Sequence, residues 1–184
     1  MIRNTGQDTY DRQDCGTIFT VTSGELRLQD IILDGGKDEG VTAYHPLICV
    51  NGNACLRMLD GAVLKNAENR SQSMCGGGIN VRQGQVYLYD GSQITHCKAR
   101  HGGGIEVNSK SSYNQAVLGM AGGSIDNCEA ADGGGVYVNI GMFQMQGGKL
   151  IENHAAREGT GGGGGIYVAG ASQKTQIAAV LIRN

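Results

Sequence analysis

The most reactive side chains of this sequence are its six cysteines, because thiols can form disulfides and bind metal ions. Cys97 and Cys128 lie 31 residues apart, and His154 follows 26 residues later. If these positions stack on successive turns about 4.8 Å apart, Cys97 and Cys128 meet the Cα distance that a disulfide requires. This spacing permits a Cys97–Cys128 disulfide. Zinc binding by these two cysteines and His154 is the less favoured alternative, because a fourth ligand and a CxxC spacing are missing.

Carboxylates are the next candidates for chemistry, because glycoside hydrolysis needs two of them about 5–10 Å apart. Asp126 and Glu152 are expected to be neighbours on an outward face. Carboxylates are common on such a solvent-exposed face, so their presence there needs no catalytic role. The outward row that contains Glu106 holds no second carboxylate. We therefore expect no catalytic residues and no enzyme activity. A carbohydrate-active lyase or hydrolase remains the alternative, because parallel β-helices host such enzymes.

No cofactor is expected. The segment 34–40, DGGKDEG, is rich in oxygen ligands but does not fit the spacing of an EF-hand. The glycine run at 162–165 precedes a strand, whereas glycine-rich loops that hold phosphates open a helix.

Three long side chains, Arg27, Arg57 and Tyr87, recur 30 residues apart and should lie in one outward line. Arginine binds carboxylates or phosphates, and tyrosine stacks on sugars or other rings. This line is the best candidate binding face. The alternative is that these long side chains simply cover the sheet.

The composition limits the partners. The net charge of −2 gives no general attraction to nucleic acid. No stretch of 18 apolar residues exists that could insert into a membrane. Glycine accounts for 32 of the 184 residues, which predicts many tight turns.

A repeat of about 30 residues must position all of these side chains. A glycine run followed by alternating apolar residues recurs as CGGGINV at 75–81, HGGGIEV at 101–107, DGGGVYV at 132–138 and GGGGIYV at 162–168. Two further apolar alternations follow in each repeat. Alternation of period two predicts strands, and a fixed period predicts stacked units. The sequence therefore predicts an all-β, right-handed parallel β-helix of about six coils, each with three short strands.

Side chains at equivalent positions should stack into rows along this helix. Two inward apolar rows are predicted: one contains Phe19, Ile48, Ile79, Ile105, Val136 and Ile166, and the other contains Leu28, Met58, Leu88, Met120 and Met145. The third strands are expected to place Ile32 and Ile151 in their inward row, which begins at Ile2. A structural asparagine ladder is predicted at one corner, with Asn66, Asn127 and Asn153 in the same row as Asp34 and His96.

Residues 1–184 are expected to form a single β-helix domain. Its two ends lack an evident cap against edge pairing, so we expect an excerpt of a longer array.

The segment GGGVYV at 133–138, together with MFQMQGGKLIENHA at 142–155, resembles the glycine-rich repeats of bacterial adhesin-like cell-surface proteins. A looser similarity links it to the repeats of polymorphic outer-membrane proteins. The resemblance covers about residues 15–184 and implies a pectate-lyase-like β-helix, but it supplies no catalytic motif.

This resemblance implies a structural or adhesive segment that presents a side face and loops, at 108–117 and 169–176, to a glycan or protein of a host, matrix or cell. The expected location is extracellular or at the cell surface, although residues 1–14 lack the apolar core of a signal peptide.

Overall fold

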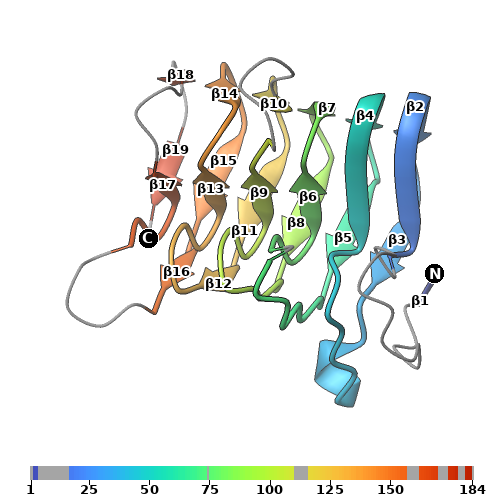
Figure 1. Cartoon of the computed structure of the whole chain (residues 1–184), viewed down its shortest axis with the longest axis vertical. Coiled ribbons are helices and arrows are strands. Elements are labelled where there is room, and N and C mark those ends of the chain that lie inside the picture. Colours follow the sequence, from blue (N-terminus) through green and yellow to red (C-terminus); the bar gives the residue numbers. More distant parts are fainter. Residues whose placement is uncertain are drawn as a thin grey trace.

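The computed structural model describes residues 2–3, 17–73, 75–109, 116–156, 162–169, 174–177 and 181–183, and the statements below concern these residues. The chain forms a parallel β-solenoid of about five turns with about 30 residues per turn, slightly fewer than the six coils predicted. Figure 1 shows the strands of successive turns lying side by side. The predicted parallel β-helix is therefore confirmed.

Each turn carries strands in three positions, and equivalent strands pair in parallel. The first two turns run through positions one and two without a break, in the long strands β2 (Phe19–Leu28) and β4 (Ile48–Met58). In later turns the first position is held by β6 (Ile79–Val81), β9 (Ile105–Val107), β13 (Val136–Val138) and β17 (Ile166–Val168). The second position is held by β7 (Gly84–Leu88), β10 (Ala116–Met120), β14 (Met142–Met145) and β18 (Lys174–Ile177).

The third position forms a separate seven-stranded sheet. Its strands are β1 (Ile2–Arg3), β3 (Ile32–Asp34), β5 (Val63–Lys65), β8 (Gln93–Thr95), β11 (Ser124–Asp126), β15 (Lys149–Ile151) and β19 (Leu181–Arg183). A small pair, β12 (Glu129–Ala130) and β16 (His154–Ala155), extends two turns, and a 3₁₀ helix, η1 (Lys37–Glu39), leaves the first corner.

The two inward rows predicted for the first and second strands are confirmed. Strand pairing aligns Ile48 with Ile79, Ile79 with Ile105, and Ile105 with Val136, and all four side chains are fully buried. Pairing also aligns the row from Leu28 to Met145. Burial of apolar area contributes about 25 cal/mol per Å², so these continuous rows are the main source of stability.

The predicted row of the third strands is wrong by one residue at two turns. Leu33, not Ile32, aligns with Leu64, and Leu150, not Ile151, aligns with Ile125. Leu33 is fully buried, whereas Ile32 is 39% exposed. Because side chains alternate between faces, a slip of one residue exchanges the inward and outward sets, and burial decides the register.

The predicted asparagine ladder is also wrong in its membership. Asn66, His96 and Asn127 occupy equivalent corner positions, as predicted, but Glu152 holds the next corner in place of Asn153. All four have left-handed backbone with φ of 50–53°. Asp34 pairs with Lys65 instead, and Asn153 lies one position beyond the corner. These residues share a left-handed backbone conformation, which asparagine tolerates well. They do not form a stack of identical amide side chains.

Within the described residues, no helix is long and apolar enough to cross a membrane.

Candidate functional site

The predicted binding line lies in one row of the second-strand sheet. Arg27 aligns with Arg57, and Arg57 aligns with Tyr87. The next position is Gly119, where an added Cβ would lie 2.6 Å from Cδ1 of Tyr87. The absence of a side chain at Gly119 therefore leaves room for the Tyr87 ring to lie along the sheet surface.

Arg57 is the centre of this face. Its Nε lies 2.9 Å from Oε2 of Glu25, and its guanidinium carbon lies 5.1 Å from the ring centroid of Tyr87 and 5.9 Å from that of Tyr89. The guanidinium also donates a hydrogen bond to the Tyr89 hydroxyl. Cation–π contacts of this kind orient both rings. The result is a surface on which the charged and aromatic groups hold one another in place.

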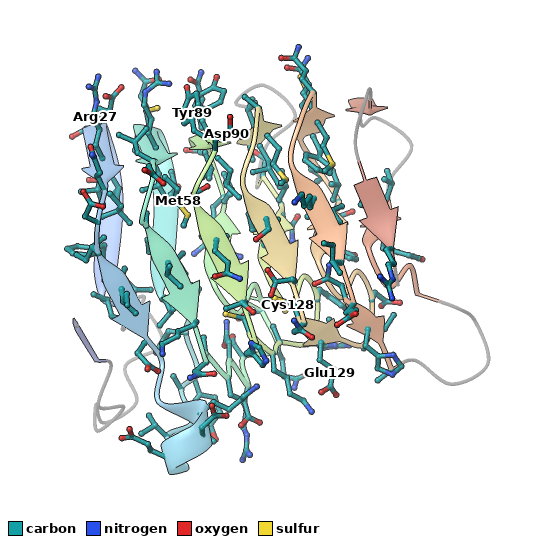
Figure 2. The ribbon with its side chains drawn as sticks, turned by 180° about the vertical axis from the view of Figure 1, so that it is seen from behind. Arg27, Met58, Tyr89, Asp90, Cys128 and Glu129 are labelled. Atoms are coloured by element: carbon teal, nitrogen blue, oxygen red, sulfur yellow. The ribbon has the colours of Figure 1, made fainter. Side chains whose placement is uncertain are left out.

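Arg27 extends this face outward. It is hydrogen-bonded to Glu25, and its side chain is 67% exposed. Hydrogen bonds from Arg27 and Arg57 hold the pKa of Glu25 below its usual value. Figure 2 shows Arg27 and Tyr89 near one end of the strands and Cys128 with Glu129 near the opposite end.

The disulfide that the spacing permits does not form between Cys97 and Cys128. Both residues are free thiols, and both are buried. Cys97 donates to the Thr95 carbonyl at 3.3 Å and Cys128 donates to the Asp126 carbonyl at 3.2 Å. The Cys128 sulfur also lies 3.9 Å from the Ile94 carbonyl oxygen of the preceding turn. Burial raises the pKa of Cys128, whereas a hydrogen bond with the Cys128 thiol lowers the pKa of Cys97.

The alternative zinc site is contradicted by the register. His154 aligns with Glu129, not with Cys128, and its side chain is exposed. The position that follows Cys128 in the inward row is held by Asn153, whose amide is not a usual zinc ligand.

The carboxylates of Asp126 and Glu152 are not neighbours in one row. Asp126 aligns with Ile151, whereas Glu152 occupies the corner. Asp126 is buried, which opposes ionisation, but hydrogen bonds from Thr95, Gln93, Asn127 and Ser124 lower its pKa overall. The hydrogen bonds from Gln93 and Thr95 link this carboxylate to the preceding turn, so its role here is structural.

A second site is created by the glycine runs. The first glycine of three of these runs has left-handed backbone, with φ of 87° at Gly76, 58° at Gly102 and 63° at Gly133. An added Cβ at Gly102 would lie 2.2 Å from the Ile105 carbonyl oxygen, so the chain folds tightly back on itself. The residue before each run is thereby placed near the residue five positions later: the Asn80 amide donates to the Cys75 carbonyl at 2.7 Å.

Glu106 occupies the outward row of the first-strand sheet, as predicted, but only 1% of it is exposed. Ser73 and Cys75 of the preceding turn lie beside it, and Asn69 donates to the Gly76 carbonyl there at 2.9 Å. The Glu106 carboxyl accepts hydrogen bonds from Asn80 and, at 3.2 Å, from Asn108. Burial raises the pKa of Glu106 to about 7, against the opposing effect of these hydrogen bonds.

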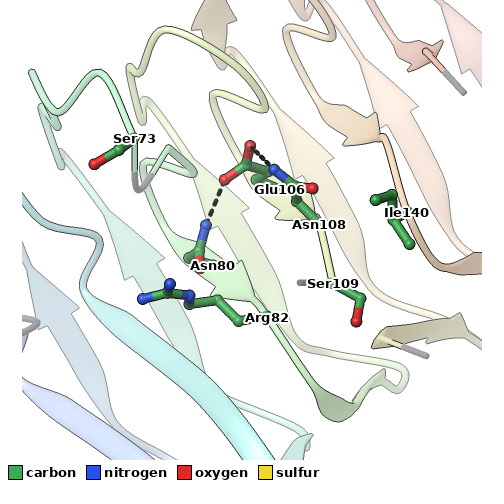
Figure 3. A pocket seen from close by; sticks show the side chains of 7 residues that line it. All are labelled: Ser73, Asn80, Arg82, Glu106, Asn108, Ser109 and Ile140. Carbon is green, nitrogen blue, oxygen red and sulfur yellow. Dashed lines mark hydrogen bonds between the residues drawn. The ribbon is translucent and has the colours of Figure 1, made fainter. Parts of the chain in front are cut away.

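The Glu106 side chain faces a polar pocket of about 460 Å³. Figure 3 shows Asn80 and Asn108 bonded to Glu106 from either side. The lining residues are Ser73, Asn80, Arg82, Glu106, Asn108, Ser109 and Ile140. Glu106 is the one carboxylate in this lining, so the pocket can hold a polar ligand but lacks the carboxylate pair of a glycosidase.

Cys75 and His101 complete this site from two successive turns. With Glu106 they place one sulfur, one ring nitrogen and one carboxylate oxygen within 4.8 Å of one another. Burial, followed by the nearby Glu106 charge, raises the pKa of the Cys75 thiol to about 12. His101 stacks on Tyr137 with ring centroids 4.6 Å apart, and Tyr137 stacks on Tyr167 at 5.7 Å.

Sequence reasoning missed this cluster. It treated Glu106 as the one carboxylate of its row and gave Cys75 and His101 no role beyond the repeat. The signal was present in the strings CGGGIN and HGGGIE, because each tight glycine run brings its two flanking residues together.

The predicted recognition loops at 108–117 and 169–176 lie largely outside the described residues. Comparison with known proteins gave no match to this chain among protein-family models, curated proteins or solved structures.

Proposed function

We propose that this chain is a structural and adhesive segment of an extracellular or cell-surface β-helix. In this role, the solenoid acts as a rigid support and presents the second-strand face to a glycan or protein on a cell or matrix. The proposal draws on the resemblance to glycine-rich adhesin-like repeats. It is supported by the parallel register that continues across both large sheets.

The observation that carries this proposal is the position of Arg57 between Glu25 and the rings of Tyr87 and Tyr89. Side chains that are already oriented lose little conformational entropy when they bind a partner. Tyrosine faces provide stacking surfaces for sugars, and the exposed Arg27 adds a charged hydrogen-bond donor beside them. This combination suits a glycan that carries carboxylate or sulfate groups.

A binding screen tests the proposal. The full chain would be applied to an array of glycans and matrix proteins, and the affinity for each retained partner would be measured. Tyr87→Ala and Arg27→Ala should each weaken binding by about tenfold or more, as expected for central aromatic and arginine contacts. Lys149→Ala, an exposed change on the third-strand sheet, should leave binding unchanged.

Two results would contradict the proposed face. One is a retained partner whose affinity falls as much with Lys149→Ala as with Tyr87→Ala or Arg27→Ala. The other is an array on which no acidic glycan or matrix protein is retained.

The second candidate function, a carbohydrate-active or glycan-binding domain, is favoured by the polar pocket beside Glu106. A carboxyl with a pKa of about 7 has the protonation behaviour of a general acid. A reducing-sugar assay would support this candidate if the full chain released sugar and Glu106→Gln did not. Binding at the pocket without release would favour the glycan-binding form.

A further inference from the structure

We propose that Cys75, His101 and Glu106 form a binding site for a divalent transition-metal ion, with Zn²⁺ the best match. This inference goes beyond the adhesive function and does not depend on it. One sulfur, one imidazole nitrogen and one carboxylate oxygen already lie within 4.8 Å of one another.

The required geometry is close to the one present. Zinc binds sulfur at about 2.3 Å and nitrogen or oxygen at about 2.0–2.2 Å, so the ligand atoms of a tetrahedral site lie about 3.6 Å apart. Any pair in this cluster therefore needs to close by no more than about 1.2 Å. Side-chain rotation of this size leaves the strands in place.

The backbone fixes the relative positions of these ligands. Cys75 and His101 hold equivalent places on successive turns, where the Gly76 amide donates to the His101 carbonyl at 2.9 Å and the Gly77 amide donates to the Gly102 carbonyl at 3.1 Å. The glycine run from Gly102 then returns the chain to Glu106. The site is thus assembled by ladder hydrogen bonds that the fold itself requires.

The groups around the ligands suit a metal centre. Nε2 of His101 lies 3.6 Å from Oδ2 of Asp132, which is buried on the following turn. Asn80 and Asn108 donate to the Glu106 carboxyl. Metal-bound histidines and carboxylates are commonly oriented by such outer partners.

An independent observation points to a missing ligand. Asn80 is 98% buried, since 2% of it is exposed, and its amide nitrogen is bonded to Cys75 and Glu106. Its Oδ1 is a buried side-chain oxygen without a hydrogen-bond partner among the described residues. Buried acceptors are rarely left in this state. A water molecule bound to the metal would supply the donor that this oxygen lacks.

The chemistry of the ligands selects the metal. A thiolate and an imidazole favour zinc or cobalt over calcium or magnesium, which prefer oxygen ligands. Three protein ligands leave a fourth position, and Glu106 faces the pocket of about 460 Å³ from which water or a ligand could reach it.

Cobalt titration tests this site directly. The full chain, reduced and freed of metal, would be titrated with Co²⁺, which reports thiolate binding through a ligand-to-metal band and tetrahedral geometry through visible bands. We expect one equivalent to bind with both signals, and Zn²⁺ to displace it. The Cys75→Ala variant should lose the thiolate band, whereas Cys97→Ala, a buried thiol elsewhere, should keep it.

Glu106→Gln provides a second test that preserves the shape of the side chain. It should retain the thiolate band but weaken binding by about 10–100-fold, the range typical of disturbed metal sites. Absence of a thiolate band in the full chain would overturn the proposal, as would an unchanged band in Cys75→Ala. If Cys75→Ala fails to fold, unchanged affinity in Glu106→Gln would overturn it.

Discussion

Asn153 is hydrogen-bonded to Cys128 on the preceding turn: its Oδ1 accepts from the Cys128 backbone amide at 3.1 Å. Its Nδ2 donates to the Ile125 carbonyl at 2.9 Å. Asn153 is 3% exposed and follows Cys97 and Cys128 in one inward row. A polar side chain thus replaces a thiol in the interior, where it satisfies backbone groups of the adjacent turn.

This relationship predicts that Asn153→Ala destabilises the protein by about 2–4 kcal/mol. The change removes two buried hydrogen bonds and leaves a backbone donor and acceptor without partners. Denaturant unfolding would measure the loss. Gln146→Ala, an exposed amide on a neighbouring strand end, should stay within about 0.5 kcal/mol of the unchanged protein. Equal effects of the two changes would contradict the role assigned to Asn153.

The same residue shows where sequence reasoning succeeds and where it stops. The first and second strands could be aligned because a glycine run or a firm apolar alternation marks each copy. The third strands end in polar residues that look equivalent, and aligning Asn153 with Asn127 placed the strand one residue out of register. The correct register depends on the burial of Leu150, which the local pattern does not reveal.

The candidate sites were predictable to different degrees. The line of Arg27, Arg57 and Tyr87 follows from the repeat period alone, because all three lie in the same strand position. The cluster of Cys75 and Glu106 depends on how far a glycine run folds back. That distance is a property of left-handed backbone and is not visible in the spacing of the repeat.

Gly102→Ala should be severely destabilising. Its φ is +58°, and an added Cβ would lie 2.2 Å from the Ile105 carbonyl oxygen, so the backbone must move. We expect a loss of at least about 3 kcal/mol. Gly24→Ala is a matched control, because φ there is +71° but an added Cβ meets nothing within 4 Å. That change should cost about 1–2 kcal/mol, from the left-handed conformation alone. Thermal unfolding of both variants would show whether the clash or the conformation dominates.

Arg57→Ala should lower the unfolding temperature more than Arg27→Ala does. Arg57 contacts Glu25 and two tyrosine rings, and its aliphatic stem covers the sheet, whereas Arg27 is largely exposed. The ion-pair part of the difference should shrink when salt is added. Calorimetry at low and high salt would measure both effects, and an equal decrease for the two variants would contradict the central position of Arg57.

Cys97 and Cys128 should resist alkylation in the folded protein and remain free of a disulfide under mild oxidation. Both thiols are buried and donate to backbone carbonyls, so a reagent or oxidant in solution reaches them only after local opening of the fold. Among the cysteines that the structure describes, Cys55, which is partly exposed, should be modified first. Mass spectrometry after timed labelling would identify the order. Rapid formation of a Cys97–Cys128 crosslink would contradict the protection of the two thiols by burial.

Glu106 should make stability fall as pH rises from about 4.5 to about 7. Its ordinary pKa of 4.5 is raised to about 7 in the folded chain, mainly by burial. Over this interval the folded state holds the proton more firmly than the unfolded state, so its release on unfolding becomes more favourable as pH increases. The stabilisation is complete below about pH 4.5 and is lost by about pH 7, which corresponds to about 3 kcal/mol.

Glu106→Gln isolates this effect, because glutamine has nearly the same size and shape as glutamate but cannot ionise. Urea unfolding with a metal chelator, from pH 4 to pH 8, should show the unchanged protein losing about 3 kcal/mol relative to the variant across the interval. Above pH 8 the difference should be constant, since Glu106 is then ionised in both states. Parallel stability curves for the two proteins would mean that the Glu106 carboxyl titrates normally and is not held in a water-poor site.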